Sequence, residues 1–265
     1  MTDFSKLPLG AIPSPPKAKD LLLSKYVGDA GRLIEAARVP VASNWQDMPT
    51  VTGALPTPDT DPLGNIAKKD CVFAAAGHLT RMVAQQVGRP ELAPTADQVL
   101  EEYDRRTGGV DQGYVIRDML DIWRTEGLWG TRLEAFARVG DSRDELAIAS
   151  WLGCGVIGGY ALPLHSQTSV DATGRQLWHV PAGGWPEGDY PGAWGNHAVW
   201  SYSESPQIKT GNSWGGPVWL TDEWGRVCCF ERWFCLVDLW RLGNVRAPNG
   251  FAWEDLLSDA RERVA

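Results

Sequence analysis

Helix signals occupy the first half of the ordered chain, and strand signals occupy the second. Expected helices cover residues 71–88, 95–105, 114–126 and 144–151. Short apolar runs typical of strands cover residues 156–162, 198–202, 207–210 and 219–220. The run 230–239 fits either a helix or a strand, because its periodicity does not decide between them. This separation predicts an α+β protein with two lobes.

Local signals set the boundaries of the first two helices. Asp70 directly precedes the first helical run and is a typical N-cap, and Gly88 is a plausible C-cap. Thr95 and Gln98 form a capping-box pattern at the start of the next helix. We therefore expect Cys71 to lie on the first turn of a helix.

The two ends of the chain differ in composition from the middle. Residues 1–19 hold four of the 18 prolines, and we expect residues 1–40 to form a Pro-rich arm. Because this arm offers few apolar positions, it is expected to pack outside the core, with a short helix at 32–38. A C-terminal helical tail is expected over residues 245–265.

Charge and apolar patterning exclude several classes of partner. The chain carries 25 basic and 33 acidic residues, for a net charge of −8, which argues against nucleic acid and anionic membranes as partners. No apolar run approaches the roughly 20 residues of a membrane-spanning helix, and the N-terminus lacks the apolar core of a secretory signal. We therefore expect a cytoplasmic or virion-associated protein without a signal peptide.

The chain is rich in tryptophan and has an odd number of cysteines. Fourteen Trp imply rings in the core or lining a groove. The five cysteines form no CxxC pair and no zinc-type cluster, so we expect reduced thiols, no disulfide, no metal and no cofactor.

Four polar residues are arranged as a thiol nucleophile requires. Cys71 begins a helix, whose N-terminus favours an anion, and His197 enters a strand candidate 126 residues later. Asn212 follows His197 by fifteen residues, a spacing that a strand–turn–strand brings back alongside. Asn65 stands six residues before Cys71, where an amide can help to form an oxyanion hole. Alone, Cys71 also fits a small buried apolar residue.

From about Trp45 to Trp219 the sequence resembles the papain-like cysteine peptidases. The resemblance rests on the Cys71 helix, on Asn-His-Ala-Val at 196–199 and on Asn-Ser-Trp-Gly at 212–215. It implies a papain-like domain over 41–244, with a helical lobe at about 65–130 carrying the Cys helix and a β-barrel-like lobe at about 131–244 carrying His and Asn.

The same resemblance implies a hydrolase that cleaves peptide or isopeptide bonds in a protein or peptide substrate. Cys71 would be the nucleophile, His197 the base, Asn212 its orienting partner and Asn65 the oxyanion donor. Trp214 would shield the His–Asn hydrogen bond. The substrate-binding residues would be Gln112, Gly113, Tyr114, Asn196 and Trp214.

Several features depart from the family pattern, two of them beside the nucleophile. Val72 stands where the family has Trp, and Asp70 adds negative charge beside the nucleophile. The chain also resembles bacteriophage and prophage proteins, so the alternative is a virion structural or assembly protein that contacts other virion proteins through its arm. His78 is expected to be packed, and His165 and His179 to be solvated. The loop 183–194 is expected over the site entrance or at a partner surface.

Overall fold

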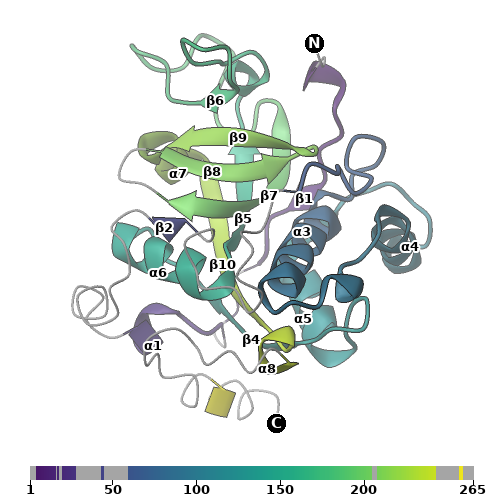
Figure 1. The fold of residues 1–265 in the computed structure, drawn as a ribbon. Helices are drawn as coiled ribbons and strands as arrows, with labels where there is room; N and C mark the ends of the chain where they lie inside the picture. Colours follow the sequence, from purple (N-terminus) through teal and green to yellow (C-terminus); the bar gives the residue numbers. More distant parts are fainter. Residues whose placement is uncertain are drawn as a thin grey trace.

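The computed structural model describes residues 4–15, 17, 20–27, 43–44, 59–204, 208–242 and 257–258. Helices α3 (Cys71–Gln86), α4 (Ala96–Thr107) and α5 (Ile116–Thr125) gather beside a large sheet (Figure 1). This confirms the expected mixture of a helical region followed by a strand-rich region. The expected helices at 32–38 and over the 245–265 tail fall largely outside the described residues.

The caps of the first two long helices follow the sequence in part. Helix α3 begins after Asp70, but the buried Asp70 side chain makes no capping hydrogen bond. Gly88 closes α3 at a φ of 70°, in the left-handed region that glycine favours. At α4, Thr95 and Gln98 exchange both hydrogen bonds of a capping box.

The sheet contains eight strands, and its order is β4–β10–β5–β7–β8–β9–β6, with β2 added against β7. Strand β7 (Gly195–Glu204) lies between β5 (Val156–Leu162) and β8 (Ile208–Ser213), antiparallel to both. Within the described residues β4 and β6 end the sheet without pairing with each other. The expected barrel-like lobe is therefore not seen, because the strands form an open sheet.

Strand β10 (Cys229–Val237) resolves the ambiguous run at 230–239. It pairs with β4 (Leu133–Arg138) on one side and with β5 on the other, so long-range pairing decides what local periodicity left open. Strand β9 (Gly216–Thr221) follows β8, and β6 (Leu177–Trp178) pairs with β9 in parallel.

The remaining described elements are short, apart from one three-turn helix. They are η1 (Phe4–Lys6), β1 (Ala11–Ile12), α1 (Ser24–Val27), β2 (Ser43–Asn44), η3 (Pro90–Leu92), β3 (Tyr114–Val115), α6 (Arg143–Gly153), η4 (Leu164–Gln167), α7 (Asp222–Cys228) and α8 (Leu239–Leu242).

Two apolar clusters hold these elements together. The larger combines α3, α4, α5 and α6 with strands β4, β5, β7 and β10 of the sheet. The smaller is rich in aromatic residues and includes Trp178, Trp214 and Trp224. Six of the tryptophans that the structure describes are buried: Trp123, Trp178, Trp200, Trp214, Trp224 and Trp233. The expectation that tryptophans build the core holds for these six.

The N-terminal arm is part of the core, so the expectation that it packs outside is wrong for its described residues. Leu21, Leu23 and Tyr26 are buried in the larger cluster. Backbone hydrogen bonds join Leu23 to Arg138, and Arg138 to Leu21, at 2.9 and 2.7 Å. A few well-placed apolar residues are therefore enough to anchor a Pro-rich segment.

All five cysteines are free thiols. Among the described residues, none of the helices has both the length and the apolar character needed to cross a membrane.

Candidate active site

Cys71 is the first residue of α3 and is fully buried. The backbone N–H of Ala198 in β7 donates to its sulfur at 3.4 Å, and the backbone of Gly10 lies near it. Burial raises the pKa of the thiol to about 12, and the nearby backbone groups of Ala198, Gly10 and Val72 offset only part of that effect. In this arrangement Cys71 is a protonated thiol whose sulfur accepts a hydrogen bond from Ala198.

The N-terminal segment 7–12 lies directly against Cys71. Its strand β1 pairs with β3 in parallel, and the N–H of Tyr114 donates to the carbonyl of Gly10 at 2.8 Å. Only glycine fits here: a Cβ on Gly10 would stand 2.1 Å from the carbonyl oxygen of Lys69, and one on Gly113 would stand 2.2 Å from the carbonyl oxygen of Gly10. The segment therefore fills the space beside the sulfur.

His197 lies on β7, next to the residue whose amide reaches Cys71. Its ring is fully buried and stacks on Trp214, with centroids 4.2 Å apart and planes 14° apart. Burial lowers the pKa of His197 to about 3, so the imidazole is neutral at neutral pH. The indole of Trp214 also donates to the carbonyl of Pro8 at 3.4 Å, so the N-terminal segment contacts this side of the site too.

Asn212 on β8 lies beside His78 of α3. Its side-chain nitrogen donates to the carbonyl of Asp59 at 2.5 Å and lies 3.4 Å from Nδ1 of His78. Nδ1 of His78 is in turn 3.0 Å from the carboxylate of Asp59, which also pairs with Arg81. Although burial opposes it, the contacts with His78 and Arg81 lower the pKa of Asp59 to about 2. His78 is thus packed, as expected, with Nδ1 directed at the Asp59 carboxylate.

Three buried oxygen atoms shortly before α3 have no hydrogen-bond partner among the described residues. These are Oδ1 of Asn65 and both carboxyl oxygens of Asp70. Asn65 is held there by a turn in which Leu63 and Gly64 take positive φ values of 54° and 95°. Burial raises the pKa of Asp70 to about 8, and nearby Asp111 adds to the effect. Asp70 is therefore largely neutral at pH 7, so the charge that the sequence placed beside Cys71 is absent.

The five expected substrate-binding residues lie on both sides of the N-terminal segment 7–12. Gly113 and Tyr114 are covered by Gly10 and β1, and Gln112 is exposed beside them. Asn196 lies on β7 opposite Ala161 of β5. Trp214, which completes the expected set, is the residue that stacks on His197. The structure thus brings Cys71, the Gly113–Tyr114 edge and Trp214 to the same segment of chain.

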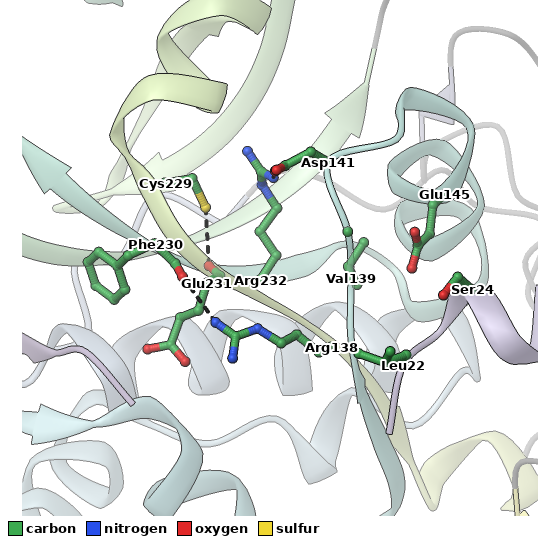
Figure 2. Close-up of a pocket in the computed structure, with 11 residues that line it drawn as sticks. Leu22, Ser24, Arg138, Val139, Asp141, Glu145, Cys229, Phe230, Glu231 and Arg232 are labelled. Atoms are coloured by element: carbon green, nitrogen blue, oxygen red, sulfur yellow. Dashed lines mark hydrogen bonds and ion pairs between the residues drawn. The ribbon is translucent and has the colours of Figure 1, made fainter. Parts of the chain in front are cut away.

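Two surface pockets lie elsewhere, and Cys71 lines neither. One, of about 430 Å³, opens over Asp59 and Arg81. The other, of about 330 Å³, is shown in Figure 2. There the buried Arg232 donates to Asp141 at 2.5 Å and to the carbonyl of Gly225 at 2.6 Å, so its charge is compensated within the protein. Arg138 donates to the carbonyl of Phe230 at 3.1 Å.

Sequence reasoning missed two features of this site. The backbone groups of Ala198 and Gly10 leave no mark in the sequence, because any residue supplies them. The Asp59–His78 pair did leave a signal: His78 follows Cys71 by seven residues, about two helical turns, and so lies on the same face of α3.

Comparisons with known proteins identify the fold. No protein-family model matches the chain, and no curated protein matches it. The structure shares the fold of a cysteine protease. One solved structure that it resembles is xylellain, a cysteine protease from Xylella fastidiosa, at a TM-score of 0.64 and 16% identity, covering 87% of this chain and 96% of xylellain. At this identity the likeness shows the fold alone.

Proposed function

We propose that this chain is a papain-like thiol hydrolase that cleaves peptide or isopeptide bonds. One observation carries the proposal: the N–H of Ala198 contacts the Cys71 sulfur at 3.4 Å. This contact joins the start of α3 to the strand that bears His197, within the fold of a cysteine protease. No observation favours the alternative of a bacteriophage virion component, which stays a prediction.

The proposed chemistry uses groups that this chain supplies. His197 takes the Cys71 proton, and the thiolate attacks the substrate carbonyl carbon. The C–N bond then breaks as the imidazolium protonates the leaving amine. Water attacks the thioester, releases the acid and restores the thiol. Asn65 is proposed to stabilise the oxyanion.

Asn212 is proposed to orient the His197 ring through Oδ1. That oxygen is buried and accepts no hydrogen bond within the described residues, so its acceptor capacity is unused in this arrangement. An amide is sufficient for this role, because only an oxygen is needed to accept the ring N–H. The stacked Trp214 would exclude water from the pair.

The proposed site is latent while segment 7–12 covers Cys71, because a substrate carbonyl needs the space that Gly10 fills. Gly10→Ala should displace the segment, since the added Cβ meets the Lys69 carbonyl. We would incubate this variant with a peptide library and identify products by mass spectrometry. The proposal predicts cleavage that is abolished by adding Cys71→Ser. Cleavage that survives Cys71→Ser, or a library left intact although Cys71 has become reactive to alkylation, would overturn it.

A further inference from the structure

His165 and His179 form a close imidazole pair away from the candidate active site. Their Nε2 atoms are 3.4 Å apart, and their ring centroids are 4.8 Å apart, with an angle of 81° between the planes. Both side chains are partly exposed, whereas the chain's other two histidines, His78 and His197, are buried. Among the four histidines, these two are therefore the ones with partly exposed side chains.

The separation of the two nitrogens matches that of two ligands on one metal ion. Two imidazole nitrogens bound at about 2.0–2.1 Å to a tetrahedral Zn²⁺ lie about 3.3 Å from each other. The 3.4 Å between the Nε2 atoms is close to this value. The near-perpendicular rings also let both nitrogens converge on a point beside the pair.

Hydrogen bonds to Ser169 assign the tautomer of His179. The Ser169 hydroxyl donates its single hydrogen to the carbonyl of Leu177, so its oxygen accepts from Nδ1–H of His179 at 3.0 Å. With its proton on Nδ1, His179 presents a lone pair at Nε2, the form that binds metal. Metal-binding histidines usually donate their second ring N–H in this way.

The backbone around the pair is fixed independently of any ligand. The Asp189 carboxylate accepts the N–H groups of Leu164 and His165 at 2.7 and 2.9 Å, which sets the position of η4. The indole of Trp178, next to His179, donates to the carbonyl of Ser166 at 3.1 Å. Burial and the neighbouring His179 lower the pKa of His165.

We propose that His165 and His179 form a two-imidazole site for a divalent transition-metal cation of the Zn²⁺ class. Imidazole suits such ions, and the Asp189 carboxylate adds negative charge nearby. Among the described residues no third His, Cys, Asp or Glu joins the pair, so water fills the remaining coordination positions. The bound ion would link η4 to the end of β6, beside Trp178, which contacts Trp214.

The test uses the full chain, stripped with a chelator and titrated with Zn²⁺. Isothermal titration should show one site, and thermal unfolding should shift upward with Zn²⁺. His165→Ala should weaken binding at least tenfold, and the His165→Ala/His179→Ala pair should abolish both signals. Ser169→Ala should weaken binding roughly 10–100-fold, as loss of a partner behind a ligand does.

A thiol control and a labelling experiment on the unmodified chain keep the test decisive. Cys229→Ser, which alters a partly buried thiol, should leave binding unchanged. If the histidine variants fail to fold, Zn²⁺ should still protect His165 and His179 from diethyl pyrocarbonate in the wild-type chain. Loss of binding in Cys229→Ser, or no protection at saturating Zn²⁺, would mean that the rings only share a hydrogen bond, and would overturn the proposal.

Discussion

Gly10→Ala should expose Cys71 and change its reactivity by a calculable amount. The added Cβ would lie 2.1 Å from the Lys69 carbonyl oxygen and 2.7 Å from its carbonyl carbon. Because non-bonded heavy atoms prefer about 3.5 Å, the segment has to shift by roughly 1 Å or more. That shift breaks the hydrogen bond from Tyr114 to Gly10 and opens the sulfur to water.

The expected magnitude follows from the thiol. Burial raises the pKa of Cys71 from its ordinary value of 9.0 to about 12. Exposure that only restores the ordinary value increases the thiolate fraction at neutral pH roughly a thousandfold, and pairing with His197 increases it further. The rate of alkylation by iodoacetamide, measured at Cys71 by peptide mapping, should increase by at least this factor.

The matched control for this prediction is Gly216→Ala. Gly216 has open space at the Cβ position, so the change adds a methyl group without displacing segment 7–12. Its Cys71 labelling should remain at the wild-type rate. If Gly10→Ala also labels at the wild-type rate while remaining folded, the segment does not control the thiol and the reasoning is refuted.

Three further changes test the burial of the site. Burial raises the pKa of Asp70 from 3.8 to about 8, so the carboxyl stabilises the fold in its protonated form. The free energy of unfolding of the wild type, measured in denaturant titrations, should therefore fall by up to roughly 5 kcal/mol between pH 4 and 8. Asp70→Asn should remove this pH dependence. An unchanged slope in the variant would contradict this. Burial lowers the pKa of His197 from 6.5 to about 3, so the free energy of unfolding of the wild type should fall as the pH falls from 6.5 to 3. His197→Gln should remove this loss of stability in acid. An equal loss in both proteins would refute the prediction. Trp214→Ala should lower the free energy of unfolding, measured in urea, by about 3–5 kcal/mol, and Trp214→Phe should lower it by less. A negligible loss would show that the stack of Trp214 on His197 does not stabilise the fold.

Local signals predicted the elements that depend on local interactions. The capping box at Thr95 and the stop at Gly88 fix helix ends through neighbouring residues, and both are present. The apolar run at 156–162 became β5 with the expected bounds. These features need no knowledge of distant partners.

Long-range pairing explains what the sequence did not predict. The β1–β3 pairing joins residues about 100 positions apart through two-residue strands, too short to produce a pattern. The contact of Asn212 with Asp59 and His78 depends on where the 59–63 turn is placed. The open sheet depends on the order of strands, which their individual sequences do not encode.

The reactivity of Cys71 against pH tests the central claim most directly, because that claim is that Cys71 and His197 work as a pair. In the Gly10→Ala background, the site should be alkylated at about pH 5–6, where an ordinary thiol is protonated and slow. Adding His197→Ala should abolish this acid-range reactivity. A rate that rises only above about pH 8, and that His197→Ala leaves unchanged, would identify Cys71 as an ordinary thiol and contradict the proposed hydrolase.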